Sequence, residues 1–348
     1  MAYISFQPND YFSTKLYTGN NSSSHAITGV GFQPDWTWIK SRNFGESHRI
    51  YDVVRGASNH ISSNGTVAQT SNFPLTSFDS DGFTIGSSDA SINGNYNYTS
   101  WNWKAGGSGS SNSDGSVTST VSASTTSGFS IVKWTANLSS AVTVGHGLGT
   151  APKVIIQKAL DQTSGWIAGG FDLDWSGYMV FNGTQAFNND SNDSSGTGRF
   201  FSAGGTEPSS TIFSTNSSAL VGSATDVIAY CFAEKKGFSK FGKYSGNNNN
   251  DGAFVYLGFK PNWLLIKQKG GTNQWQMRDG QRGFNGAIKT LYTDSAEQET
   301  SGDTIDLLSN GFKLRNNSPV QNTAEEFIYM AFAEEPLVSS NGVPATAR

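Results

Sequence analysis

Four tryptophans, Trp36, Trp38, Trp101 and Trp103, are the residues of this sequence whose type and spacing most suggest a binding chemistry. One polar residue separates the members of each pair, so both rings of a pair point to the same face of a β-strand. On a surface, such rings would stack on the sugar rings of a glycan or pack against a partner protein. The other interpretation is that they fill a core, because similar segments further along the chain carry other apolar side chains at the matching positions. The core interpretation is favoured, and one ring of each pair remains a candidate contact for a glycan or a partner.

The four histidines and the single cysteine form no pattern typical of a metal site or a catalytic site. His25, His48, His60 and His146 lack the short spacings of a zinc motif, and one cysteine cannot build a structural zinc site or an internal disulfide. His146 lies between two glycines and is expected to be a turn residue. Cys231 lies in an apolar run and is expected to be a buried thiol. We therefore predict no catalytic residue, no metal and no cofactor.

Two oxygen-rich segments could hold a cation. Asp79 and Asp81 precede Gly82 with the spacing that begins a calcium loop, but no glutamate follows at the distance that such a loop requires. Residues 247–251 form a similar segment of asparagines that ends in an aspartate. A solvated turn is the favoured interpretation of both. Sugar cleavage by paired carboxylates stays open, because the two acids of such a pair can come from distant strands.

Composition argues against several classes of partner. The formal net charge is -4, the isoelectric point is about 5.6, and no block of Lys or Arg is present, so no nucleic-acid partner is expected. No apolar segment approaches the roughly 20 residues that cross a bilayer, and the first residues do not resemble a signal peptide. We expect no membrane insertion and synthesis in the cytoplasm. An aromatic content of 13% argues for packed structure rather than disorder.

Three segments of the chain share one order of landmarks, which indicates an internal repeat. A glycine-rich turn ends in a proline, and a strand-like run ends in a lysine six residues later: Pro34 to Lys40, Pro152 to Lys158, and Pro261 to Lys267. A second short run follows: His48 to Asp52, Trp166 to Phe171, and Trp275 to Asp279. Each copy closes on an aromatic strand, and Asp-Gly and Asn-Gly pairs supply tight turns. This pattern predicts an all-β protein of three tandem, diverged β-sandwich modules of jelly-roll-like character.

The predicted domain boundaries follow the repeat. Module 1 covers residues 1–106, module 2 covers 128–236, and module 3 covers 237–348 with a C-terminal tail. Residues 107–127 are rich in Ser, Gly and Thr and are predicted to be a flexible linker, with one poorly held strand as the alternative. Modules 2 and 3 join directly, so we expect them to pack rigidly while module 1 has more freedom. Each module has about 100 residues, which is enough for one core of its own.

The whole chain resembles a family of virion structural proteins of tailed bacteriophages, of the marine and cyanobacterial phage type, whose members are often described as tail-fibre-like. The phrases that carry the resemblance are residues 4–12 with 15–19, 29–40, 51–56, 78–83, 101–106 and 332–348. The resemblance implies a virion protein that is assembled in the host cytoplasm and released by lysis. It implies other virion proteins, tail or capsid subunits, as partners, a host-surface glycan as a further one, and an oligomeric state in the particle. It implies no catalytic residues.

Three functions are weighed on this basis. The expected one is a non-enzymatic structural protein of the phage surface, associated with the tail or tail fibre, that acts in assembly or host contact. The second is a capsid decoration (cement) protein that stabilises the head. The third is a glycan-binding or depolymerase module.

Overall fold

The computed structural model describes residues 7–136, 141–189, 201, 206–216, 226–283, 285–302 and 304–334. In this part of the chain the regular elements are β-strands, apart from a single 3-10 turn, η1 (Pro8–Asp10). The large sheets are antiparallel throughout. The prediction of an all-β fold built from antiparallel sheets is confirmed. Within the described residues, no helix has the length and apolar character to span a membrane.

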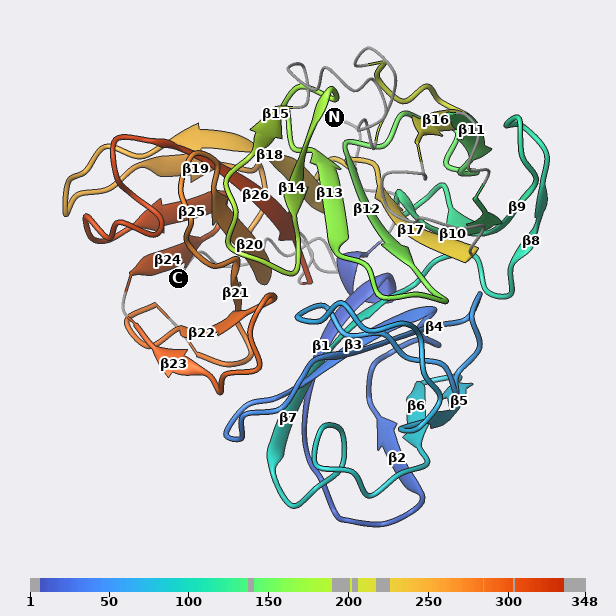
Figure 1. Cartoon of the computed structure of the whole chain (residues 1–348). Coiled ribbons are helices and arrows are strands. Elements are labelled where there is room, and N and C mark those ends of the chain that lie inside the picture. Colours follow the sequence, from blue (N-terminus) through green and yellow to red (C-terminus); the bar gives the residue numbers. More distant parts are fainter. Residues whose placement is uncertain are drawn as a thin grey trace.

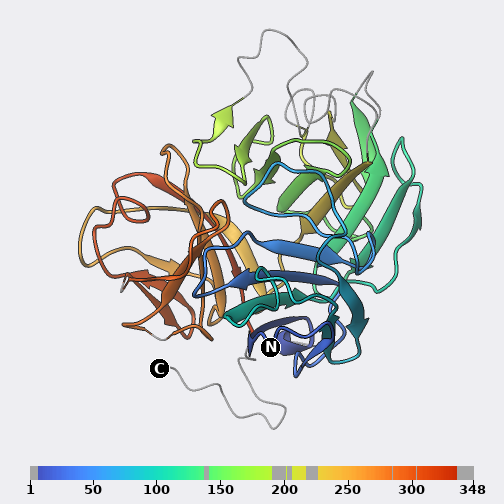
Figure 2. The same ribbon diagram turned by 60° about the horizontal axis from the view of Figure 1, so that its bottom comes forward.

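The strands gather into three lobes around a common centre, as both views show (Figures 1 and 2). Lobe 1 comprises residues 7–106. Its inner sheet has the order β1 (Phe12–Thr18), β7 (Asn97–Trp103), β3 (Trp36–Ser41), β4 (Arg49–Asp52). Its outer sheet has the order β2 (His25–Thr28), β6 (Gly82–Ile85), β5 (Leu75–Asp79). The last two strands are joined by the predicted Asp81-Gly82 turn.

Lobe 2 comprises the described residues between 107 and 236 and carries the largest sheet. Its order is β15 (Asn188–Asn189), β14 (Gly177–Val180), β13 (Trp166–Gly170), β12 (Val154–Ala159), β17 (Asp226–Phe232), β10 (Phe129–Thr135), β9 (Ser119–Ser124), β8 (Ser110–Asn112). A two-stranded outer sheet pairs β11 (Val142–Gly145) with β16 (Ile212–Thr215).

Lobe 3 comprises residues 237–334. Its inner sheet has the order β18 (Ser239–Ser245), β26 (Glu326–Phe332), β20 (Trp263–Gln268), β21 (Gln276–Asp279), β22 (Lys289–Tyr292), β23 (Thr300–Ser301). Its outer sheet has the order β19 (Phe254–Tyr256), β25 (Gly311–Leu314), β24 (Ile305–Leu308). The four-strand order of lobe 1, β1-β7-β3-β4, recurs as β10-β17-β12-β13 and as β18-β26-β20-β21. The sequence landmarks therefore mark equivalent strands.

Each lobe is a sandwich with apolar side chains between its two sheets. In lobe 1 this core includes Ile27 and Phe83 from the outer sheet and Ile39 and Tyr98 from the inner sheet. Separate clusters occupy the same place in lobe 2 and lobe 3. Alternate side chains of the inner strands point to the opposite face, toward the centre of the molecule. The middle strands of the inner sheets are therefore buried on both faces, as predicted for residues 328–332.

The central faces of the three inner sheets form one further core that all lobes share. The cluster unites residues such as Trp103 of lobe 1, Phe232 of lobe 2 and Phe332 of lobe 3. Trp103 and Phe232 each lie within ring-contact distance of Phe332, with centroids 5.6 and 5.9 Å apart. Each module was expected to have one core of its own. The structure adds a core that all three lobes share, and lobe 1 contributes to it as the other two lobes do.

The segment predicted as a flexible linker, residues 107–127, is instead part of the lobe 2 sheet. Strand β9 pairs with β10 from Ser124↔Phe129 to Thr120↔Lys133, and β8 extends the sheet beyond it. Val121 is buried in the lobe 2 core. The prediction of a linker was wrong because backbone hydrogen bonds to β10 hold a segment whose Ser, Thr and Gly side chains show little apolar pattern.

Candidate functional site

The four tryptophans lie in the central core, on neighbouring strands β3 and β7. The register pairs Trp36 with Trp103 and Trp38 with Trp101. Their exposed fractions are 2%, 1%, 0% and 1% for Trp36, Trp38, Trp101 and Trp103. No ring face is left on which a glycan could stack in the single chain. The role as contact residues for a glycan is therefore not supported, and the favoured alternative, a place in the core, is what the structure shows.

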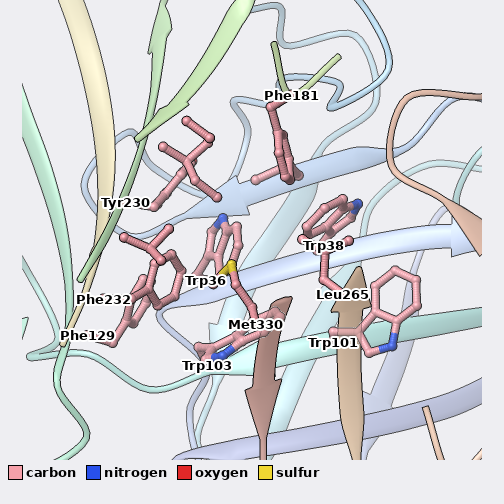
Figure 3. Packing of buried hydrophobic residues seen from close by; sticks show 14 of the residues in the cluster. Trp36, Trp38, Trp101, Trp103, Phe129, Phe181, Tyr230, Phe232, Leu265 and Met330 are labelled. Carbon is pink, nitrogen blue, oxygen red and sulfur yellow. The ribbon is translucent and has the colours of Figure 1, made fainter. Parts of the chain in front are cut away.

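These tryptophans join lobe 1 to both other lobes. Trp36 contacts Phe129 and Tyr230 of lobe 2, with ring centroids 5.5 and 4.7 Å apart. Trp103 contacts Trp263 of lobe 3 at 5.6 Å. Figure 3 shows Trp36, Trp103, Phe129 and Tyr230 near one another, with Met330 of lobe 3 among them. Since aromatic pairs contribute energy beyond the area they bury, this cluster is a main source of adhesion between the lobes.

Two buried ion pairs lie at the edge of the same cluster. Arg55 Nε donates to Asp52 Oδ2 at 2.5 Å, and Arg282 Nε donates to Asp279 Oδ2 at 2.6 Å. All four side chains have no exposure to solvent. In both pairs the second carboxylate oxygen accepts the backbone N–H of the arginine at 2.9 Å. A buried charge pair is tolerable only when its remaining hydrogen-bonding groups also find partners.

A neighbouring lobe supplies one of those partners to each pair. The hydroxyl of Tyr230 in lobe 2 donates to Asp52 Oδ2 at 2.8 Å, and the indole of Trp101 in lobe 1 donates to Asp279 Oδ2 at 2.9 Å. Tyr230 and Trp101 occupy the same position in their inner sheets, opposite Ile156 and Trp38. Two of the three lobe junctions therefore use the same arrangement, in which a buried Asp–Arg pair accepts a hydrogen bond from the neighbouring lobe.

At the third junction, between lobes 2 and 3, apolar side chains take the place of this hydrogen-bonded ion pair. Met330 of lobe 3 stands where Tyr230 and Trp101 stand in the other lobes, opposite Leu265. Gly170 of lobe 2, which pairs with Val154, stands where Asp52 and Asp279 stand in the other lobes. Phe171 follows it directly. Met330 and Phe171 both belong to the shared core, so neither leaves a polar group without a partner. The sequence signal for the two ion pairs was an Asp-x-x-Arg-Gly pattern repeated at one place in copies 1 and 3, and the sequence analysis missed it.

Three further hydrogen bonds connect the lobes. They are made by the equivalent residues Trp166, Trp275 and His48, each of which begins the second short run of its copy. Trp166 Nε1 of lobe 2 donates to the carbonyl of Ser62 in lobe 1 at 2.8 Å. Trp275 Nε1 of lobe 3 donates to the carbonyl of Val180 in lobe 2 at 2.9 Å. In lobe 1 the position is His48, whose Nε2 lies 2.9 Å from the carbonyl of Tyr292 in lobe 3. Each lobe thus bonds to the next, and the ring closes.

His48 is held as a neutral imidazole by its surroundings. Its Nδ1 accepts a hydrogen bond from Trp38 Nε1 at 2.7 Å, so Nε2 carries the proton that is donated to Tyr292. Burial, assisted by the charge of Lys40, holds the pKa of His48 well below its ordinary value. A histidine that is neutral and bonded at both nitrogens is a structural link rather than an accessible base.

The lysine that ends the first run of each copy is buried in all three lobes. Lys40, Lys158 and Lys267 have no exposed surface. Each Nζ donates to the carbonyl of the next residue, at 2.8, 2.7 and 2.9 Å. Among the described residues, no carboxylate lies within ion-pair distance of these three. Burial therefore lowers the pKa of each to about 8.

A lysine with a lowered pKa is often a nucleophile or a base in an active site. Here the same arrangement occurs three times, and carbonyl oxygens surround the ammonium groups. Lys158 also reaches the carbonyl of Thr66 in lobe 1 at 3.4 Å, and Lys267 reaches that of Gly271 at 2.8 Å. The lysines hold strand ends and adjoining loops. The six-residue step from proline to lysine in the sequence therefore reflects a buried lysine that makes the same contact in each lobe.

The remaining candidate residues take part in local structure. His146 follows strand β11, and its Nδ1 accepts the N–H of Leu148, while Cys231 is buried as predicted. Asp81 accepts the backbone N–H groups of Gly29 and Gly31 at 2.9 and 2.7 Å. These bonds lower its pKa. Across the described ranges, no three His, Cys, Asp or Glu side chains gather in a way that could hold a metal ion.

One family model matches residues 7–336, and its description is a domain of unknown function, DUF7483. The chain belongs to the DUF7483 family. No curated protein and no solved structure matches the chain. The matched region covers all three lobes together. A DUF7483 domain is therefore the complete ring with its shared core, and a single lobe is only a part of it.

Proposed function

We propose that this DUF7483 protein is a non-enzymatic structural protein of a tailed-phage particle, placed on the particle surface with the tail or its fibres and acting in assembly or host contact. One observation carries the proposal: the buried polar groups of the described chain link three lobes into a closed ring. The tryptophans, the Asp–Arg pairs, His48 and Lys158 contribute to that ring. The similarity of the sequence to virion structural proteins supplies the biological setting.

The arrangement of the lobes supports a role in an assembly. Three lobes with the same order of inner strands lie around one centre (Figure 1). Such a chain can make matching contacts with a partner of threefold symmetry, because identical or similar surfaces repeat with the same rotation. Adhesion through one large aromatic core also gives a rigid block, which suits a protein that has to keep its shape outside a cell.

Two carboxyl groups have raised pKa values, and their hydrogen bonds to the backbone support a non-catalytic role. Burial raises the pKa of Asp35, and it raises that of Asp294 to about 6. A raised pKa is what a general acid for sugar cleavage needs. However, Asp35 accepts the N–H groups of Ala105 and Gly107 at 2.7 and 3.1 Å, and Asp294 accepts the N–H of Trp275 at 3.1 Å. Both are therefore engaged with the backbone.

The test is the position and copy number of the protein in purified particles. Quantitative mass spectrometry should find it at a few to a few tens of copies, and antibody labelling in electron microscopy should place it on the tail. Hundreds of copies on the head would replace this proposal by the capsid decoration role. Absence from particles, or release of oligosaccharide from host-surface polysaccharide by the purified protein, would refute it.

A further inference from the structure

Strand β19, at the edge of the outer sheet of lobe 3, carries two aromatic side chains that point away from the core. Phe254 and Tyr256 are separated by one residue and therefore share one face of the strand, while Val255 between them packs into the lobe 3 core. Their exposed fractions are 45% and 60%. They are two of the four large hydrophobic side chains that are exposed in the part of the chain that the structure describes. Both rings can therefore be reached from solvent.

The outer sheets of the other lobes show that the fold does not require these rings. In each lobe one buried pair joins the edge strand to its neighbour: Val255↔Phe312, Ile27↔Phe83 and Val144↔Phe213. The residues on either side of the buried edge residue are therefore equivalent: Phe254 and Tyr256 in lobe 3, Ala26 and Thr28 in lobe 1, Thr143 and Gly145 in lobe 2. An exposed aromatic pair at positions that accept small side chains indicates a contact with something outside the chain.

Charged groups adjoin both rings and already have partners. Lys313 lies opposite Phe254 on the neighbouring strand β25, and its Nζ lies 2.7 Å from a carboxylate oxygen of Asp251. Lys240 Nζ donates to the carbonyl of Tyr256 at 2.8 Å and lies 5.4 Å from the centre of its ring. Both ammonium groups are therefore engaged, and the surface fits a neutral ligand better than a charged one.

The size of this surface favours a glycan over a protein partner. An aromatic side chain buries about 150–250 Å² in a contact, so the two partly exposed rings offer together on the order of 200 Å². A stable protein interface, including one with a second copy of the chain, needs about 800 Å² on each partner. A sugar needs much less, because the C–H groups of one pyranose ring stack on one aromatic face and its hydroxyls bind to the polar groups beside it.

The cavity of lobe 1 is less suited to a ligand. It has a volume of about 310 Å³, lies between strand β4 and residues 60–73, and is lined by Arg49 and His60. Arg49 Nε and His60 Nδ1, which have no partner, are buried within its wall, and the charge of Arg49 already interacts with Asp89 and Glu46. The open rings of lobe 3 have no such obstacle.

We propose that Phe254 and Tyr256 form a platform on which a neutral glycan stacks. Side chains two residues apart on one strand lie about 7 Å from each other, so a single sugar covers one aromatic ring and an oligosaccharide covers both. Lys313 and the exposed Asp251 supply a donor and an acceptor for sugar hydroxyls. The platform gives the host-contact part of the proposed function a ligand and rests on that proposal only for the source of the glycan.

Isothermal titration of the purified full chain with cellotriose at pH 7 tests the proposal. The hydroxyls of its glucose rings are equatorial, so C–H groups are presented on both ring faces. Cellotriose should bind saturably and at least about threefold more tightly than glucose, which covers only one aromatic ring. Equal binding of the two, or no saturable binding of cellotriose, would overturn the platform. Tighter binding of trigalacturonic acid would overturn the neutral ligand class.

Two variants locate the platform. Phe254→Ala and Tyr256→Thr introduce the residues that lobe 1 carries at these positions, so both are expected to fold, as circular dichroism will show. Each should weaken cellotriose binding at least about threefold. Phe44→Ala, which removes an exposed aromatic ring of lobe 1, is the matched control and should leave binding unchanged.

Unchanged binding in both lobe 3 variants would overturn the platform. If neither variant folds, the comparison of cellotriose with glucose still decides. Sedimentation of the unliganded chain tests the other occupant: a dimer that is lost in Phe254→Ala would assign the surface to a second copy and overturn the glycan.

The two proposals fail separately. Binding is measured on the isolated chain and does not depend on any particle. Absence of cellotriose binding would leave the position in the virion untouched, while absence of the protein from particles would leave the measured affinity in place.

Discussion

Substitution of Lys158 by methionine probes how a buried lysine shapes the pH dependence of stability. Its pKa is about 8 in the folded chain, whereas a lysine in an unfolded chain titrates near 10.4. Between pH 7 and pH 9 the folded state releases this proton while the unfolded state keeps it. The unfolded state then binds more protons, so the free energy of unfolding rises with pH in this window.

The size of the effect follows from the two pKa values. One lysine with these values adds about 1.4 kcal/mol to the free energy of unfolding between pH 7 and pH 9. Lys40, Lys158 and Lys267 together add about 4 kcal/mol, because all three pKa values are near 8. Buried tyrosines and Cys231 have raised pKa values and act in the opposite direction, by less than about 1 kcal/mol at pH 9. The wild-type chain should gain about 3 kcal/mol.

Urea unfolding at pH 7, 8 and 9 measures this gain. The Lys158→Met variant should lose about 1.4 kcal/mol of it, whatever its stability at pH 7, because only the slope depends on the titration. Lys153→Gln, at an exposed position, is the matched control and should keep the full slope. A wild-type stability that is flat or falls from pH 7 to pH 9 would refute the reasoning, as would an unchanged slope in Lys158→Met.

Two further predictions concern the lobe junctions and the cavity. Tyr230→Phe removes the hydroxyl that donates to buried Asp52 and should lower the free energy of unfolding by about 1–3 kcal/mol. Tyr256→Phe, at an exposed position, is the control and should change it little. Equal effects of the two variants in urea unfolding would contradict a stabilising role of the Tyr230–Asp52 hydrogen bond. Burial lowers the pKa of His60 to about 4, below that of an unfolded histidine, so its contribution to stability is present above about pH 6.5 and is lost toward pH 4. His60→Thr should therefore lose less stability than the wild type between pH 7 and pH 4, by up to about 3 kcal/mol, and an identical loss in thermal unfolding would argue against a buried neutral imidazole.

The repeat made the equivalence of strands in the three copies predictable, but the sequence could not show the strand order or what the strands pack against. The six-residue step from Pro34 to Lys40 and its two counterparts marked equivalent strands correctly, because proline, turn glycines and apolar runs act locally. Alternation also showed that Trp36 and Trp38 share one face. Which partner covers that face depends on contacts distant in the sequence, here with lobes 2 and 3.

Polar contacts between the lobes were hidden for the same reason. An aspartate at position 52 looks like a surface residue until Tyr230, 178 residues away, is placed beside it. Strand β9 was missed because most of its side chains are small and polar, and only Val121 marks its buried side. The cavity residues Arg49 and His60 gave no signal as a pair, since their proximity follows from the return of the chain at residues 60–70.

The shared core explains why the family model covers the ring and not a single repeat. In the middle strands of each inner sheet, one face is covered by the lobe's own outer sheet and the other face by the neighbouring lobes. A lobe separated from the ring would expose its central aromatic face to water, at a cost of about 25 cal/mol for each Å² of apolar surface. It would also uncover an ion pair such as Asp52–Arg55, whose bond from Tyr230 would be lost. The three lobes are therefore interdependent, and they differ in detail, as at the cavity of lobe 1, while they share one strand order.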